Sequence, residues 1–131
     1  MKPTSSSLVT DRKRTRGRGS AHSGTGHFWL QRVSGAALVP LTVFFVATLI
    51  ALAGAGRAEA LATVRNPFFG LALAGFILAG AYHMRLGMQV VIEDYVHAEG
   101  PKLALLILNT VFAAFFALAG VYAVVRISLG S

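Results

Sequence analysis

Three long apolar runs, separated by two short polar connections, constrain this chain more than any other feature. The first, residues 33–53, contains 21 residues and no charged side chain. A helix of that length, at about 1.5 Å per residue, crosses a hydrocarbon layer of about 30 Å. Residues 67–92 and 103–126 are long enough to do the same. Because backbone polar groups in lipid must bond within their own segment, we predict an all-α integral membrane protein with three transmembrane helices.

Proline and glycine mark the limits of these spans. Pro67 suits the first turn of a helix, and Gly100 with Pro101 separates the second span from the third. Pro40 lies inside the first span, where it removes a backbone donor and is expected to bend the helix. Residues 54–66 are predicted to form a short polar connection.

The charge distribution predicts how the chain is oriented. The formal net charge is +7, and seven of the twelve cations precede the first span, with Asp11 as the only acid before it. Positive charge beside a span is typical of the cytoplasmic side. We therefore predict a flexible, basic cytoplasmic tail over residues 1–26 and a membrane domain over residues 27–131, in a bacterial inner membrane.

Two processing signals are alternatives for this basic segment. The first apolar run is too long for the core of a secretory signal peptide, which disfavours that interpretation. A mitochondrial transit peptide stays open, because the segment is rich in Arg and Ser and poor in acids. The membrane would then be the mitochondrial inner membrane.

The composition excludes several classes of function. The chain has no cysteine, which excludes disulfides, thiolate metal sites and iron–sulfur ligation by this chain. It also lacks the dinucleotide-binding, P-loop and H-E-x-x-H patterns. Nucleic-acid binding is not expected, because a basic run beside an apolar segment more often faces anionic lipid. A redox centre here would have to use histidine.

Residues 83–95 bring titratable side chains into the second span. At about 100° per residue, His83, Gly87 and Asp94 share one helix face. An ionisable residue within a span is costly and indicates a functional site. His83 could be a neutral imidazole hydrogen-bonded between helices, or an axial haem ligand in a flat apolar slot. The residues alone leave both interpretations open.

Other polar residues lie toward the predicted cytoplasmic side. Arg32 and Arg85 could be cations that reach the lipid headgroups, or donors to haem propionates or a quinone carbonyl, and His27 belongs to the same rim. Asp94 and Tyr95 fit an ordinary interfacial helix end. They also fit a quinone site, because quinone reduction needs two protons as well as two electrons.

The pattern H-x-x-x-G-x-Q beginning at His83, followed by Asp94 eleven residues later and then Tyr95, carries a specific resemblance. Over about residues 27–127, this three-span chain resembles the D-type hydrophobic membrane-anchor subunits of succinate dehydrogenase, the succinate:quinone oxidoreductase of respiratory complex II.

The resemblance implies that His83 is one axial ligand of haem b, with the other supplied by a C-type anchor subunit in a shared helical bundle. It implies that Tyr95, with Asp94 beside it, lines a ubiquinone site, and that Arg32 lies near that site and the haem propionates. The further partners it implies are an iron–sulfur subunit and a flavoprotein subunit, docked on the cytoplasmic face. The chain alone would catalyse nothing.

Three alternative functions remain. A cofactor-free structural anchor or assembly protein would pair its buried polar groups with one another. An anchor of fumarate reductase would run the reaction in reverse, because the direction depends on redox potentials set largely by the partners. A small transporter would carry polar residues along more than one span, whereas residues 33–53 and 103–126 carry few.

Overall fold

The computed structural model describes residues 22–130, which form four helices: α2 (His22–Ala51), α3 (Arg57–Arg65), α4 (Pro67–Tyr95) and α5 (Glu99–Ser128). This confirms the all-α prediction. Most of the predicted tail, residues 1–26, lies outside the described residues, and its last five positions belong to α2.

Three of the helices are long and apolar enough to cross a membrane: Thr25–Ala51, Pro67–Tyr95 and Glu99–Ser128. The prediction of three transmembrane helices is therefore confirmed. Each of these helices extends beyond its predicted span at one end or both. The helical backbone continues past the apolar run into the region where lipid meets water. The connection over residues 54–66 contains the short helix α3.

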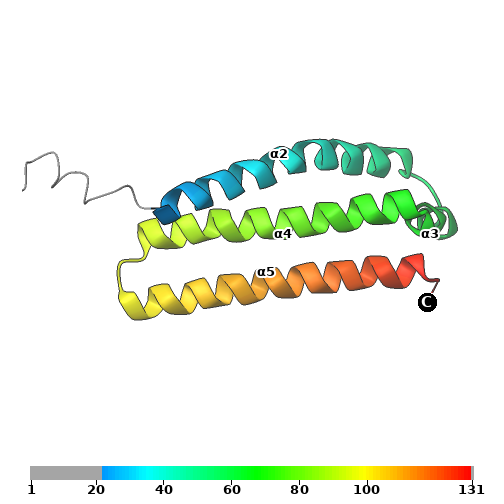
Figure 1. Cartoon of the computed structure of the whole chain (residues 1–131). Helices are drawn as coiled ribbons and strands as arrows, with labels where there is room; N and C mark the ends of the chain where they lie inside the picture. The colour runs from blue at the N-terminus through cyan, green and yellow to red at the C-terminus, as the bar shows by residue number, and fades with distance from the viewer. Residues whose placement is uncertain (1–21, 131) are drawn as a thin grey trace, which may run out of the picture.

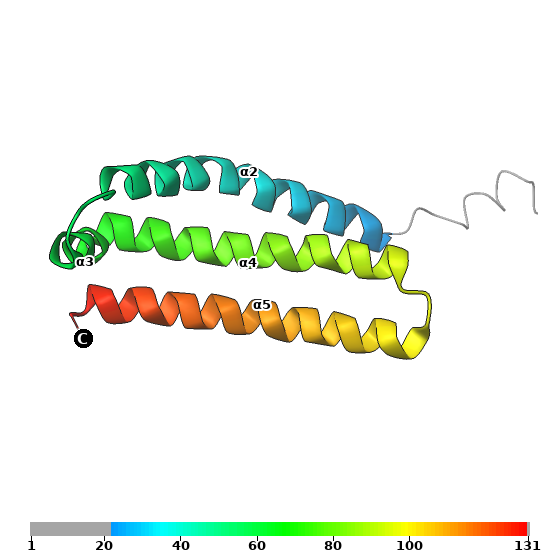
Figure 2. The ribbon, with the colours of Figure 1, turned by 180° about the vertical axis from the view of Figure 1, so that it is seen from behind.

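The three long helices form a single layer with α4 in the middle. Helix α4 packs against both α2 and α5, and within residues 22–130 those two outer helices do not contact each other (Figures 1 and 2). The start of α2 and the α4–α5 connection lie at one end of the layer, here called the tail end. Helix α3 and the end of α5 lie at the other. Helix α2, with Pro40 inside it, curves along its length.

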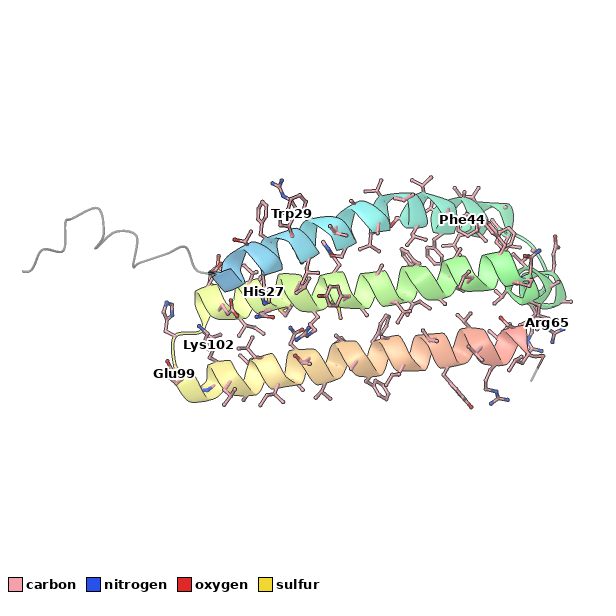
Figure 3. All side chains as sticks on the ribbon, viewed as in Figure 1. His27, Trp29, Phe44, Arg65, Glu99 and Lys102 are labelled. Atoms are coloured by element: carbon pink, nitrogen blue, oxygen red, sulfur yellow. The ribbon has the colours of Figure 1, made fainter. Side chains whose placement is uncertain are left out.

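Side-chain hydrogen bonds join α3 to the end of α5. Arg65 Nε donates to the backbone oxygen of Ile127 at 3.3 Å, and Ser128 Oγ donates to that of Val64 at 3.3 Å. Gly70 makes this approach possible, because a Cβ there would lie 3.0 Å from both Ser128 Oγ and the Val64 oxygen. Figure 3 shows Arg65 at this end. These contacts place the first connection and the end of α5 side by side.

Close packing of α4 on α5 depends on Gly120. A Cβ at this position would lie 2.7 Å from Ile77 Cγ2, which belongs to a β-branched side chain and cannot swing away freely. Gly120→Ala should therefore destabilise the fold by about 1–3 kcal/mol through overpacking. Thermal unfolding of the chain in detergent measures this. Gly100→Ala is the control in the same helix, because a Cβ at Gly100 would have open space for 4 Å around it; equal stability of the two variants would contradict the prediction.

Few apolar side chains are buried within the described chain. The buried ones are Ala81, Leu86, Ile92, Ala113 and Val124. Most other large apolar side chains point away from the layer, including Trp29 on the outer side of α2 (Figure 3). Such a surface is suited to lipid or to partner helices, because helices in a bilayer associate by close packing rather than by escape from water.

Candidate functional site

His83 projects from α4 onto α2 and is half-buried there. Its Nδ1 lies 3.0 Å from Ser34 Oγ, and its Nε2 lies 3.4 Å from Gln31 Nε2. The ring edge rests on the α2 backbone at Gly35, where a Cβ would lie 3.2 Å from His83 Cε1. The histidine singled out by the sequence is thus held between the first two spans.

Ser34 and Gln31, the two α2 residues that contact His83, include one buried polar atom that has no hydrogen-bond partner in the described part of the chain. Ser34 is buried and donates to the backbone oxygen of Gln31 at 3.1 Å. Gln31 Oε1 is buried and has no hydrogen-bond partner among residues 22–130. An unsatisfied buried polar atom is unusual and calls for a missing partner. The side chain of Gln31 packs over Gly87, where a Cβ would lie 3.3 Å from its Nε2.

An open groove of about 360 Å³ lies between α2 and α4 on the tail-end side of this histidine. Its lining residues are His27, Phe28, Gln31, Arg32, Leu86 and Val90. The guanidinium of Arg32 lies 4.3 Å from the centroid of the Phe28 ring, a cation–π contact. Figure 3 shows His27 near the start of α2. Two predicted rim residues, Arg32 and His27, therefore line one groove, and Gln31 joins that groove to His83.

Asp94 and Tyr95 end α4 at the tail end of the layer. Both are exposed, Tyr95 by 79%, and neither makes a side-chain hydrogen bond to another described residue. At about 1.5 Å per residue, Asp94 lies about 16 Å along the helix from His83. Their carboxylate and phenol groups are thus free to meet a ligand or a partner chain.

Arg85 lies on the other side of α4 and contacts α5. Its Nε donates to Thr110 Oγ1 at 3.2 Å, and its backbone oxygen accepts from Asn109 Nδ2 at 2.9 Å. Two residues along a helix correspond to about 200°, which explains why Arg85 and His83 face opposite neighbours. Arg85 borders a different open groove, between α4 and α5.

The histidine site offers one ring nitrogen that lacks a short hydrogen bond. His83 is the histidine held between two spans, so it would be the imidazole that this chain contributes to a haem. One ring nitrogen of His83 has a short contact to Ser34, whereas the other meets only the amide of Gln31 at 3.4 Å. The oxygen of that Gln31 amide has no hydrogen-bond partner among the described residues. One ligand from this chain and one from another subunit would complete an axial pair.

Sequence reasoning did not single out Gln31 and Ser34 as site residues. A signal for them was present, because His27, Gln31 and Ser34 are spaced at i, i+4 and i+7 and form a polar stripe on an otherwise apolar helix. That stripe faces the histidine of the next span.

The chain has three spans, one histidine held between two of them and a groove beside it that is lined by Arg32 and His27. These features define a small multi-pass membrane subunit with a polar site inside its helices. The family described as succinate dehydrogenase/fumarate reductase transmembrane subunit matches residues 7–119 of this chain. The chain therefore belongs to that family, and the predicted resemblance is confirmed.

Curated relatives agree with this assignment. The succinate dehydrogenase hydrophobic membrane anchor subunit of Paracoccus denitrificans is 36% identical over 123 residues, which cover 94% of this chain and 95% of the relative. That of Rickettsia conorii is 36% identical over 95 residues, covering 72% and 75%. The succinate dehydrogenase membrane anchor subunit of Reclinomonas americana is 30% identical over 96 residues, covering 70% and 78%. No solved structure matches the chain significantly.

Proposed function

We propose that this anchor subunit supplies one axial ligand, His83, to a haem b shared with a second anchor subunit, and forms part of a ubiquinone-reduction site. The observation that carries the proposal is the position of His83 between α2 and α4, with one nitrogen bonded to Ser34 and the other meeting only the Gln31 amide at 3.4 Å. The groove beside His83 also supports the proposal, because its lining residues Arg32 and His27 can donate hydrogen bonds to a charged ligand.

A bound haem would supply one-electron transfer within the membrane. The chain's own residues would hold its charged edge. Arg32 and His27 line the groove next to Gln31, so their donors suit propionates at the tail end. Arg85 stays a third candidate for a propionate, although it contacts Thr110 on the α5 side and would need an approach from that side.

The proposed quinone site includes Tyr95, Asp94 and Arg32. Tyr95 can donate a hydrogen bond to a quinone carbonyl. Asp94 beside it can take up a proton from the aqueous side and deliver it to the quinone site, because quinone reduction consumes protons. The end of α4 and the start of α2 lie together at the tail end of the layer, which supports a site assembled from both helices (Figure 1).

The proposed orientation places the tail end in the cytoplasm of a bacterium, or in the matrix if the membrane is the mitochondrial inner membrane. The cations before the first span support this orientation through their attraction to that side. The site would then open toward the flavoprotein and iron–sulfur subunits. The three relatives are named as succinate dehydrogenase anchors, which favours succinate oxidation over fumarate reduction.

Purification of the complex through a tag on this chain tests the proposal. We expect a flavoprotein, an iron–sulfur protein and a second hydrophobic chain to co-purify, with one b-type haem per flavin and succinate:ubiquinone reductase activity. Subunit identification, a reduced-minus-oxidised spectrum and a flavin assay measure these quantities. A stable, active complex with no haem would contradict the haem assignment.

A cofactor-free anchor is the second candidate, and one observation favours it. Both ring nitrogens of His83 already have a polar neighbour on α2, so the imidazole can be satisfied between the helices without a metal. In that case replacing His83 would destabilise the contact between α2 and α4, and the complex would show no haem spectrum even before the replacement.

A further inference from the structure

Ser34 contacts the Nδ1 edge of the His83 ring from α2. Its side chain is buried, with 8% of the residue exposed, and its Oγ lies 3.0 Å from His83 Nδ1 and 3.1 Å from the backbone oxygen of Gln31. A hydroxyl has a single hydrogen to donate. When that hydrogen goes to the Gln31 carbonyl oxygen, Ser34 Oγ accepts from His83, and the ring then carries its hydrogen on Nδ1.

The contact at the other ring nitrogen is compatible with this arrangement. The Nε2 of Gln31 can only donate, and it lies 3.4 Å from His83 Nε2. With the hydrogen on Nδ1, His83 Nε2 presents a free lone pair to that amide. The opposite arrangement, with a rotated Gln31 amide and the hydrogen on His83 Nε2, would satisfy Gln31 Oε1 but give up the bond between Ser34 and the Gln31 backbone. A metal on Nε2 excludes that arrangement, because Nε2 would then carry no hydrogen.

Gly35 fixes the position of the ring while Ser34 fixes its hydrogen. The His83 Cε1 edge lies so near the α2 backbone that a Cβ at Gly35 would be 3.2 Å away. The ring cannot shift further toward α2, and rotation about its axis would break the bond to Ser34. Nε2 lies next to Gln31, which lines the groove between α2 and α4.

We propose that Ser34 is a positioning residue for haem binding: it holds the His83 hydrogen on Nδ1 and so presents Nε2 to the iron. This rests on the proposed function, in which His83 is an axial ligand. An acceptor on the second ring nitrogen of a metal-bound histidine fixes the tautomer, orients the ring and makes it a stronger electron donor. Loss of such an acceptor typically weakens metal binding about 10-fold to 100-fold.

The test compares Ser34→Thr with Ser34→Val in the complete complex. The two replacements have nearly the same shape, and only threonine keeps the hydroxyl. Haem loss to an excess of apomyoglobin, the electron paramagnetic resonance spectrum of the ferric haem and the haem midpoint potential are the three measurements. We expect Ser34→Thr to behave as the unmodified complex. Ser34→Val should lose haem about 10-fold faster or more, with shifted g values and a more positive potential.

Thr48→Val is the matched control. Thr48 Oγ1 donates to the backbone oxygen of Phe44 at 2.8 Å in the same helix, a bond of the same kind as that of Ser34 but without an imidazole. We expect it to leave all three haem measurements unchanged. Ser34→Ala, which adds no atoms, replaces the valine variant in the comparison if that variant fails to assemble.

The outcomes separate this proposal from the one on which it rests. If His83→Leu removes haem while Ser34→Val and Ser34→Ala keep normal haem retention, g values and potential, Ser34 has no positioning role and His83 is still the ligand. Equal loss in Ser34→Thr and Ser34→Val would also overturn the role of the hydroxyl. If His83→Leu keeps its haem, the ligand assignment fails, and the role of Ser34 fails with it.

Discussion

Replacing His83 with leucine is expected to remove the b-type haem from the complex. His83 lies between two spans, whereas the side chains of His27 and His97 are exposed. Leucine has no donor atom, so the axial bond from this chain would be lost. Losing a residue that only hydrogen-bonds a metal ligand typically lowers metal affinity about 10-fold to 100-fold. Losing the ligand itself should therefore lower the haem content by at least about 10-fold. The reduced-minus-oxidised spectrum per flavin measures it.

Two controls make this result specific. His97→Leu alters a histidine in the α4–α5 connection at the tail end and should leave the spectrum unchanged. His27→Leu changes a residue of the groove rather than the proposed ligand and should keep the haem, with at most a shifted spectrum. Flavin and iron–sulfur content show whether the complex still assembles. An intact spectrum in His83→Leu would exclude this histidine as a ligand.

Replacing Tyr95 with phenylalanine is expected to reduce succinate:ubiquinone reductase turnover by about 100-fold, the lower part of the range for losing a positioned acid or base. The phenol is 79% exposed at the end of α4 and makes no side-chain hydrogen bond to another described residue, so its removal should leave the fold unchanged. The loss should appear as a lower kcat, because proton donation to the quinone is impaired. Turnover with a soluble ubiquinone analogue measures it.

An acceptor that bypasses the quinone site provides the internal control. Succinate oxidation by phenazine methosulfate should proceed at its normal rate in the Tyr95→Phe complex, because the flavoprotein is untouched. Tyr122→Phe removes another exposed phenol, from the far half of α5, and should keep normal quinone turnover. Normal turnover and quinone affinity in Tyr95→Phe would show that Tyr95 has no part in the quinone site.

The fold was largely predictable because its main constraint is local. A run of about 20 apolar residues has to satisfy its backbone within itself when it enters lipid, so length and composition alone predict each span. Helix α3 was not predicted, because residues 54–66 were predicted only as a connection between two spans. Its sequence is rich in helix-forming residues, with Glu59 in the first turn and Arg65 in the last. The bonds from Arg65 and Ser128 that join it to the end of α5 link distant parts of the chain and leave no local pattern.

The candidate site was predictable in its main residue and not in its surroundings. His83 stands out because an imidazole at membrane depth is costly, and the helical period separates it from Arg85. The sequence could not select Ser34 and Gln31 as its neighbours, since their polar stripe acquires a role only when α2 lies against α4.

By itself, the sequence determined three membrane-spanning helices, an excess of cations before the first one, and a single histidine well inside a span. The tertiary structure decided that this histidine faces α2 rather than α5, that Ser34 and Gln31 contact its two nitrogens, and that Arg32 and His27 share a groove beside it. The physical reason is that α2 and α5, the two neighbours of α4, are about equally apolar, and α4 carries small residues along much of its length. Without a hydrophobic difference between neighbours, only the detailed fit of side chains selects which faces meet.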